Sequence, residues 1–156
     1  MARIELPAGE GMDVARALAL APHFVDVVVG YEKAVASSPL DPRLHELVRY
    51  RVAQLNDCAL CLNSRRSGSG VDDDVLQQVA DWATSPVFSP AERRALSFTE
   101  QFCTDSAAIG DDLLAALQDD LGPAGLADLA LVVGKYLAMG RFMQVLGLDQ
   151  ACSVVL

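Results

Sequence analysis

Two cysteines separated by two residues, Cys58 and Cys61, are the part of the sequence best suited to chemistry. A helical pattern precedes them, so the pair falls at the start of the next helix, where neighbouring turns bring the two thiols close enough to form a disulfide. Unpaired backbone N–H groups and the positive end of the helix dipole favour a thiolate at such a position. The pair is therefore a candidate redox site.

Two other interpretations of the Cys58–Cys61 pair stay open at this point. Zinc needs four ligands, usually from a second CxxC or a histidine pair at regular spacing. The remaining sulfur and imidazole candidates are scattered singly along the chain, at Cys103, Cys152, His23 and His45. The third interpretation is that both cysteines are core residues. A thioredoxin-type site requires a strand before the motif, so a redox pair here belongs to a helical scaffold.

Helix signals recur along the whole chain, and no segment alternates apolar and polar residues as a half-buried strand does. Asp41-Pro42 and Ser89-Pro90-Ala91-Glu92 are N-terminal capping sequences. The expected helices span about 22–36, 42–55, 72–82 and 90–103, a short one capped by Asp111, a run from Gly122-Pro123 to 139, and 140–146 after a break. The sequence predicts an all-α bundle of about eight helices in one domain, residues 1–156.

Composition and charge exclude several classes of protein. The 156 residues are 52 % hydrophobic and 21 % charged, which excludes a disordered chain. The net charge is −9, and all of it comes from residues 71–156, since residues 1–70 carry eight acidic and eight basic side chains. An acidic protein repels phosphate backbones and anionic lipid, so we expect neither nucleic acid nor a membrane as a partner.

Localisation and assembly follow from the apolar segments. The longest of these, 126–139, is interrupted by Asp128 and Lys135, and the N-terminus lacks the pattern of a signal peptide. We therefore expect a cytoplasmic protein. Residues 27–29 and 129–133 are apolar around more than one helical face. These surfaces predict a homo-oligomer, and the alternative is a fully buried central helix.

The segment from His45 to Cys61, HELVRYRVAQLNDCALC, resembles the alkylhydroperoxidase D / carboxymuconolactone decarboxylase family. The features that match are the glutamate twelve residues before the first cysteine, the RVAQLN stretch and the CxxC pair. Residues 88–96, FSPAERRAL, look like the family's capped helix, and the resemblance covers roughly residues 20–148. It implies an all-α fold that assembles into trimers or hexamers.

The resemblance to the antioxidant branch of this family implies a role for each matching residue. Cys61 attacks a hydroperoxide, and Cys58 resolves the resulting sulfenic acid as a disulfide. A dithiol or thiol reductant, which Cys58 faces, then reduces the disulfide. Glu46 is the origin of a proton relay. No metal, flavin, haem or other cofactor takes part.

This chain departs from the antioxidant branch at the relay histidines. Leu60 stands where that branch has a histidine inside the CxxC, and Arg65 stands where it has one four residues after the second cysteine. We expect Arg65 to lie one turn after Cys61 on the same helix face and to favour its thiolate, and to pair with Glu46 across a helical hairpin. An Arg65–Glu46 pair that only stabilises the hairpin is the alternative. A guanidinium cannot pass a proton, because its pKa lies above ~12. Water or Tyr50 is then expected to protonate the leaving alkoxide.

The matching and the departing residues leave three candidate functions. The first is a thiol-dependent hydroperoxide reductase or related disulfide oxidoreductase that uses Cys61 and Cys58. The second is a family member without peroxidase activity that acts as an oligomeric binding or redox-sensing protein. The third is a lactone decarboxylase, which needs histidine acid–base chemistry and has only His23 and His45 available.

For the remaining polar residues we expect mostly structural roles. His23 is a surface or core residue, and His45 points about 100° away from Glu46 on a helix, so it is not the partner of that carboxylate. Cys103 is a small buried hydrophobe. Residues 72–74, three aspartates, are an N-cap and first turn rather than a metal site. Candidates for lining a cleft are Tyr136 and Arg141.

Overall fold

The structure is a computed structural model and describes residues 2–148. In that range the chain forms seven α-helices and two short 3-10 helices, without a strand. The α-helices are α1 (Asp13–Ala19), α2 (Pro22–Ala36), α3 (Pro42–Leu55), α4 (Ala59–Asn63), α5 (Asp73–Gln77), α6 (Pro90–Thr104) and α7 (Asp111–Leu146), and the 3-10 helices are η1 (Val79–Asp81) and η2 (Ser106–Ala108). The predicted all-α class is confirmed.

The capping sequences begin their helices where the sequence predicts. The Asp41 carboxylate accepts hydrogen bonds from the backbone N–H groups of residues 43 and 44, at 3.0 and 3.1 Å. Ser89 and Glu92 form a reciprocal capping box at the start of α6. The Asp72 side chain caps α5 through the Val75 N–H at 2.9 Å, which confirms the structural interpretation of the three aspartates.

The last helix differs from the prediction. Gly122 has φ 71° and ψ 168°, which only glycine adopts without strain, and Pro123 restarts the helix after this kink. From there the helix is continuous to Leu146, so the predicted break at Gly140 is wrong. A single glycine weakens a helix without ending it. The N-cap is Gly110 rather than the predicted Asp111.

Helix α7 is also long and apolar enough to cross a membrane, judged by length and composition alone. The core helix of a folded protein passes the same test, so one such helix is weak evidence for a membrane span. Helix α7 contributes Leu129, Val132 and Val133 to the main hydrophobic cluster.

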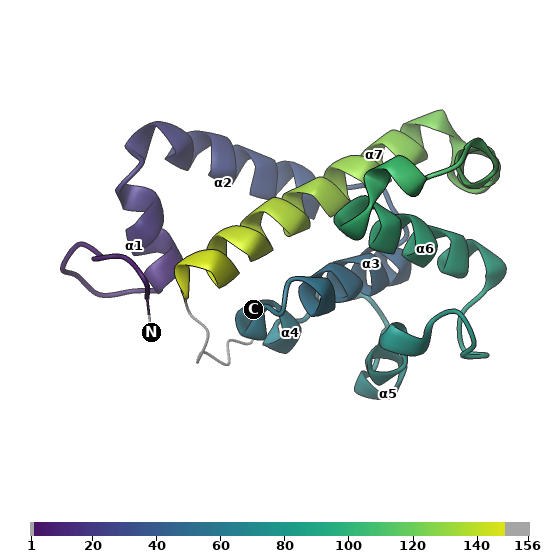
Figure 1. The fold of residues 1–156 in the computed structure, drawn as a ribbon, viewed down its shortest axis with the longest axis horizontal. Helices are drawn as coiled ribbons and strands as arrows, with labels where there is room; N and C mark the ends of the chain where they lie inside the picture. The colour runs from purple at the N-terminus through teal and green to yellow at the C-terminus, as the bar shows by residue number, and fades with distance from the viewer. Residues whose placement is uncertain (1, 149–156) are drawn as a thin grey trace.

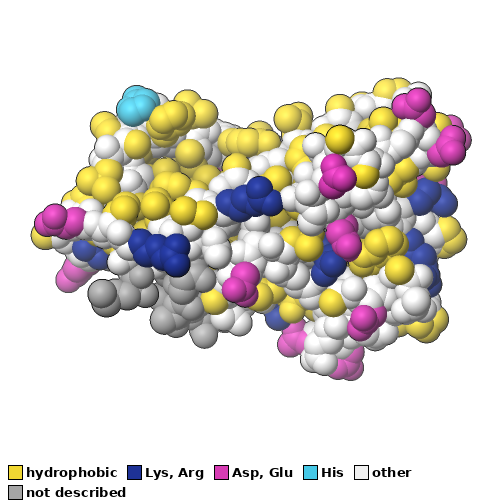
Figure 2. Space-filling view, in the orientation of Figure 1, with side chains coloured by type: hydrophobic (Ala, Val, Ile, Leu, Met, Phe, Trp, Pro, Cys, Tyr) yellow, Lys and Arg dark blue, Asp and Glu magenta, His cyan; other side chains and the backbone are white. Residues whose placement is uncertain are grey.

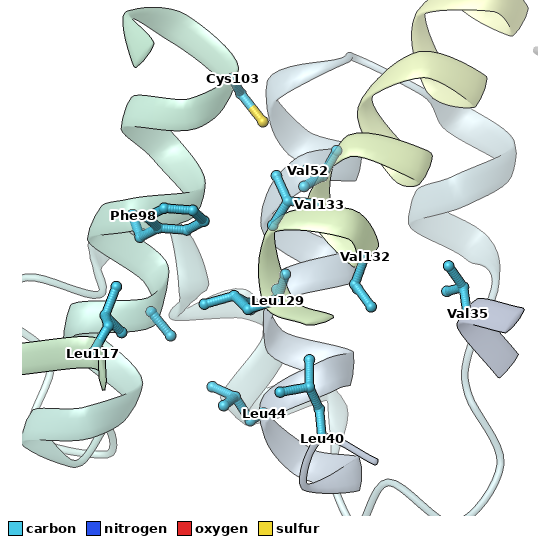
Figure 3. Packing of buried hydrophobic residues seen from close by; sticks show 12 residues of the cluster. Val35, Leu40, Leu44, Val52, Phe98, Cys103, Leu117, Leu129, Val132 and Val133 are labelled. Carbon is cyan, nitrogen blue, oxygen red and sulfur yellow. The ribbon is translucent and has the colours of Figure 1, made fainter. Parts of the chain in front are cut away.

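The core forms where α3, α6 and α7 pack together (Figure 1). Figure 3 shows how side chains from these helices converge, with Phe98 of α6 and Leu129 of α7 facing Leu44 and Val52 of α3. Because α3 is at the centre of this packing, its residues 44–49 are all buried. The core therefore fixes the helix that carries Glu46.

A second hydrophobic cluster lies around the cysteine pair. It joins the first residues of the chain to α1, α4 and the end of α7, and the Arg3 N–H donates to the Leu146 carbonyl at 2.8 Å. Its buried members are Ala17, Cys58, Leu60, Met143 and Leu148. The N-terminal segment, α1 and the end of α7 thus wall in one side of α4.

Helix α2 is apolar but poorly covered. Val35 is its only residue counted as buried, whereas Phe24 is 53 % and Val27 63 % exposed. Leu131 of α7 is also 61 % exposed. In Figure 2 hydrophobic side chains gather over the part of the molecule formed by α1 and α2. A large apolar area of this kind is typical of an interaction surface.

Candidate active site

The two cysteines lie at the start of α4 and are joined in a disulfide, with a Cα–Cα distance of 5.2 Å. Cys58 is the N-cap residue, and its sulfur accepts a hydrogen bond from the Cys61 N–H at 3.3 Å. The predicted position of the pair at a helix start is confirmed.

Access to the two sulfurs is unequal. Cys58 is 0 % exposed because the second hydrophobic cluster covers it, whereas Cys61 is half-buried. Cys61 is therefore the more accessible of the two sulfurs. The resemblance predicts that Cys58 faces the reductant, whereas in this structure Ile4, Leu6 and Phe142 are among the residues packed around Cys58.

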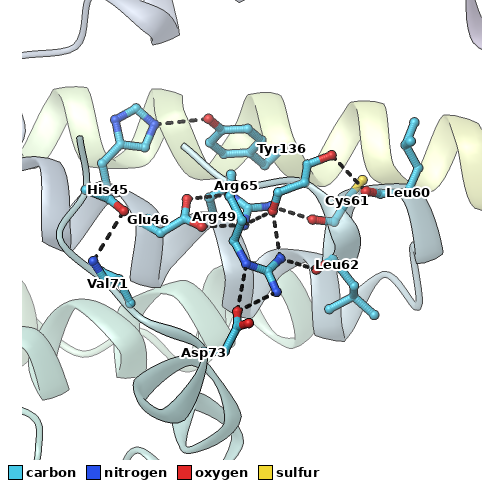
Figure 4. A network of polar contacts seen from close by, with 12 residues as sticks. His45, Glu46, Arg49, Leu60, Cys61, Leu62, Arg65, Val71, Asp73 and Tyr136 are labelled. Atoms are coloured by element: carbon cyan, nitrogen blue, oxygen red, sulfur yellow. Dashed lines mark hydrogen bonds and ion pairs between the residues drawn. The ribbon is translucent and has the colours of Figure 1, made fainter. Parts of the chain in front are cut away.

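Glu46 is fully buried and forms its ion pair within its own helix. Its two carboxylate oxygens accept from Nε and Nη2 of Arg49, each at 2.7 Å. The same guanidinium donates to the backbone carbonyls of Cys61 at 2.5 Å and Ser64 at 2.9 Å. Arg49 thus connects the Glu46 carboxylate to both ends of the Cys61 turn (Figure 4).

Arg65 does not occupy either predicted position. Helix α4 ends at Asn63, so Arg65 lies beyond it rather than one turn after Cys61 on the same helix. Its guanidinium pairs with Asp73, at 3.0 Å between Nη2 and Oδ1, and not with Glu46. The physical reason is that Arg49, one turn from Glu46 on α3, already satisfies that carboxylate.

Tyr50 lies between two cations near the cysteine turn. The Arg49 guanidinium carbon is 5.9 Å from the centre of its ring, and that of Arg65 is 5.5 Å away. The side chain is half-buried. Cation–π contacts of this kind hold the ring in place.

His45 is fully buried, and its partner is Tyr136 of α7, 91 residues away in the sequence. Its Nε2 lies 3.1 Å from the tyrosine hydroxyl, and its Nδ1 has no hydrogen-bond partner in the range that the structure describes. Burial, together with the charges of Arg66, Arg49 and Lys135, lowers the pKa of His45 to about 4. The expectation that His45 is not the partner of Glu46 is confirmed.

Tyr136 is a contact point for several groups around His45. Lys135 lies 4.4 Å from the centre of its ring, and the positive charges of Arg66 and Arg49 oppose the rise in its pKa. Burial raises the pKa of Tyr136, so the phenol keeps its proton at neutral pH. The sequence indicates Tyr136 only as a candidate for lining a cleft, because a pairing over 91 residues leaves no local signal.

The other candidates have structural positions. Cys103 is buried, and burial raises the pKa of its thiol to about 11, which confirms it as a small core residue. Arg141 donates to the Cys103 carbonyl at 2.7 Å. His23 is exposed and packs on Phe24. No metal-binding group of His, Cys, Asp and Glu occurs within residues 2–148, and Cys152 lies outside the described residues.

Solved structures with this fold include two bacterial proteins. One is a protein of unknown function from Agrobacterium tumefaciens, proposed to be the antioxidant defence protein AhpD, with a TM-score of 0.72 and 21 % identity over 83 % of this chain and 91 % of that one. The other is an uncharacterised peroxidase-related protein with an alkylhydroperoxidase AhpD core from Ralstonia eutropha JMP134, with a TM-score of 0.71 and 20 % identity over 91 % of this chain and 78 % of that one. At these identities the likeness shows the fold.

Sequence relatives include two uncharacterised bacterial proteins. YnjA of Escherichia coli K12 is 32 % identical over 77 % of this chain and 67 % of its own length. YdfG of Bacillus subtilis 168 is 24 % identical over 82 % of this chain and 90 % of its own. The sequence profile of the carboxymuconolactone decarboxylase family matches residues 22–101, which include α3 and the cysteine pair. The chain belongs to the carboxymuconolactone decarboxylase family and has the AhpD-like fold.

Proposed function

We propose that this protein is a thiol-dependent hydroperoxide reductase that uses Cys61 and Cys58. The observation that supports this most directly is the disulfide between a half-buried and a fully buried cysteine at the start of α4. Cys61 can meet a substrate, and Cys58 is held where it can close onto Cys61. The more accessible cysteine suits the role of nucleophile, and the buried cysteine suits the role of resolving partner.

The oxidative half of the reaction begins with both cysteines reduced. The Cys61 thiolate attacks the terminal oxygen of the hydroperoxide, the O–O bond breaks, and the alkoxide leaves and takes up a proton to become the alcohol. Cys61 is now a sulfenic acid. The Cys58 thiol attacks its sulfur and loses its proton, the S–S bond forms, and hydroxide leaves with that proton as water.

The reductive half begins at the accessible sulfur. A thiolate of an external dithiol attacks Cys61, and Cys58 leaves as a thiolate that the Cys61 N–H stabilises. The second thiol of the reductant attacks the mixed disulfide and releases Cys61. The sum is one hydroperoxide and one dithiol converted to one alcohol, one water and one cyclic disulfide.

Glu46 acts in this proposal as a positioning residue. Both of its oxygens accept charge-assisted hydrogen bonds from Arg49, which in turn holds the Cys61 and Ser64 carbonyls. The pair therefore fixes the turn that carries the nucleophile. With Leu60 and Arg65 at the relay positions, the proton for the alkoxide comes from water or from Tyr50, and a Tyr50→Phe variant distinguishes the two.

A second candidate function is favoured by Leu60 and Arg65, the residues at the two relay positions. Leu60 has no proton to give, and Arg65 is occupied by Asp73. A chain without a relay can still form the disulfide, and it would then act as a redox-responsive or binding protein. A lactone decarboxylase is less well supported, because His45 is fully buried.

We also propose that the protein works as a cytoplasmic homo-oligomer. The poorly covered α2 supports this, since Phe24 and Val27 of α2 and Leu131 of α7 are more than half exposed in the single chain. A thiol pair that must be reduced in each cycle suits a reducing compartment.

The function is tested by following the consumption of cumene hydroperoxide with dithiothreitol as the reductant. We expect turnover by the wild type, background rates for Cys61→Ser, and wild-type rates for the control Cys103→Ser, whose thiol is buried and of raised pKa. If the wild type and Cys61→Ser are equally inert while the disulfide still forms in the wild type, this result contradicts a peroxidase and favours the redox-responsive function.

Variants that lack one cysteine of the pair, treated with a disulfide probe, test which sulfur the reductant attacks first. We expect Cys58→Ser to collect a mixed disulfide on Cys61 after treatment with the disulfide of glutathione, because Cys61 is accessible. The Cys61→Ser variant should react much more slowly at the buried Cys58. Intact-protein mass spectrometry measures both, and equal labelling would contradict the proposed order.

A further inference from the structure

We propose that residues 2–7 form a strap that opens and closes over Cys58, and that this strap sets which sulfur of the disulfide a thiol reductant attacks. The proposal rests on the proposed function for the role of the disulfide as the group that the reductant attacks. The strap is an extended segment outside any helix, and it lies beside the end of α7 (Figure 1).

The inward side chains of the strap contribute to the cover of Cys58. Side chains alternate along the strap, because Ala2, Ile4 and Leu6 are half-buried and the side chains between them are exposed. All three pack against the second hydrophobic cluster. Cys58 is a fully buried member of that cluster, whereas Cys61 is one of its partly buried members. Lifting the strap therefore removes cover chiefly from Cys58.

Few bonds hold the strap against α7. Between residues 2 and 148, its one backbone–backbone hydrogen bond runs from the Arg3 N–H to the Leu146 carbonyl at 2.8 Å. The Arg3 guanidinium donates to the Val145 carbonyl at 3.2 Å. Both acceptors belong to the last turn of α7, where carbonyls have no partner within the helix and bond water when none is supplied. The strap can therefore leave while α7 keeps its own hydrogen bonds, which is local opening rather than unfolding.

Arg16 of α1 holds the other end of the strap. Its Nε and Nη2 donate to the Pro7 carbonyl at 2.9 and 2.7 Å, and its Nη1 pairs with Asp13 at 3.1 Å. Between Pro7 and α1 the chain passes through Gly9 and Gly11, whose φ angles of 151° and 107° favour glycine. A Cβ at either glycine would meet no atom within 4 Å. This exposed and loosely packed segment is suited to be the hinge of the strap.

The position of the strap changes the course of thiol–disulfide exchange. With the strap closed, a reductant thiolate attacks the Cys61 sulfur, a mixed disulfide forms there, and Cys58 leaves as a thiolate. With the strap open, a thiolate can also attack the Cys58 sulfur, and Cys61 then leaves as the thiolate. In both cases the second thiol of the reductant breaks the mixed disulfide, so one dithiol is oxidised for each disulfide reduced. Opening thus adds a route that releases the nucleophile in the first step.

The test measures access to each sulfur separately. The substitutions Cys103→Ser and Cys152→Ser remove the other thiols, and adding Cys61→Ser or Cys58→Ser leaves a single thiol. The probe is dithiodipyridine, and the absorbance of the released thiopyridone gives the rate of reaction. The rate at Cys61 divided by the rate at Cys58 is the preference for Cys61. We expect a strong preference while the strap is intact, because Cys58 is fully buried.

Two substitutions open the strap from different sides. Ile4→Asp places a charge on its inward face, and we expect the preference for Cys61 to fall by about tenfold or more. Arg16→Gln removes both hydrogen bonds to the Pro7 carbonyl, and we expect a fall of about threefold or more.

Three control substitutions should keep the preference for Cys61. Glu5→Gln changes an outward side chain of the strap. Arg94→Gln removes the same charge as Arg16→Gln, but from a surface pair with Asp120 that does not touch the strap. Leu114→Ala weakens the main hydrophobic cluster and so lowers the stability of the whole chain without altering the strap.

An unchanged preference in Arg16→Gln and in folded Ile4→Asp would overturn the strap. An equal fall in Leu114→Ala would overturn it too, because unfolding of the whole chain would then expose Cys58. Circular dichroism shows whether Ile4→Asp folds, and Arg16→Gln alone gives the answer if it does not. The labelling needs no turnover. A fall in preference without any consumption of hydroperoxide would therefore support the strap and contradict the proposed function, and turnover without the fall would do the reverse.

Discussion

His45 is a neutral imidazole enclosed by α3 and α7, and its protonation links folding to pH. Its pKa is lowered from 6.5 to about 4, so the unfolded chain binds more protons than the folded chain between these values. The free energy of unfolding therefore contains a His45 contribution that is complete above about pH 6.5 and is lost as the pH falls to about 4. We expect that contribution to be about 3 kcal/mol, measured by urea unfolding across this range.

The two histidines of the chain provide a matched control for the pH dependence. A His23→Gln variant changes an exposed imidazole and should keep the wild-type slope of stability against pH. A His45→Gln variant is less stable at pH 7 and should lose the part of the slope between about pH 4 and pH 6.5. An unchanged slope in His45→Gln would show that other groups produce it.

For single residues, signals from neighbours in the sequence predict the structure correctly, whereas pairings between distant residues do not follow from them. The buried Cys103 and the capping Asp72 follow from their neighbours in the sequence. The sequence predicts Arg65 as the partner of Glu46 on the premise that the helix continues past residue 63, whereas α4 ends there and Arg49 binds that carboxylate instead. The contact of His45 with Tyr136 depends on the packing of α7 and has no local signature.

At the scale of elements, Gly140 shows why α7 and the end of α3 lie so close. A Cβ at position 140 would be 2.2 Å from Nδ2 of Asn56, which donates to the Tyr136 carbonyl. We expect Gly140→Ala to lower the free energy of unfolding by about 1–3 kcal/mol, because the Asn56 side chain must leave this position. Thermal and urea unfolding measure the loss.

Gly134 on the same helix is the control for this substitution. The nearest atom to a Cβ there is the Tyr31 hydroxyl oxygen, at 3.6 Å, which is ordinary contact. The better helix propensity of alanine then makes Gly134→Ala neutral or stabilising by up to about 1 kcal/mol. Equal losses in the two variants would mean that contact with Asn56 is not the cause.

Helix boundaries were predictable where a cap or a proline marks them. Helices α2, α3 and α6 begin at prolines that the sequence predicts, since these signals act within one turn. Helix α1 was missed because it is seven residues long and lacks a side-chain cap. The break expected at Gly140 was wrong because packing against Asn56, rather than flexibility, accounts for that glycine.

For the molecule as a whole, the exposed apolar side chains of α2 predict that copies of the chain assemble into a homo-oligomer. Val27 is 63 % exposed, and burial between copies is what would cover it. We expect Val27→Glu to shift the protein toward a 16.6 kDa monomer in size-exclusion chromatography with light scattering. Lys33→Gln changes the charge of the same helix by the same amount at another exposed position, and its assembly should match the wild type. A monomeric wild type would contradict the proposal.

The continuous part of α7, from residue 123 to 146, also limits how the length of the chain can vary in evolution. One residue inserted after Lys135 would rotate every later side chain by about 100°, because each residue of a helix adds that angle. Gly140 would then move away from Asn56, and Met143 would leave the cluster around Cys58, while Leu129 stayed in place. The loop at residues 67–70, outside any helix, has no such register. We therefore expect insertions and deletions among homologues to collect at 67–70 and to be absent from 123–146.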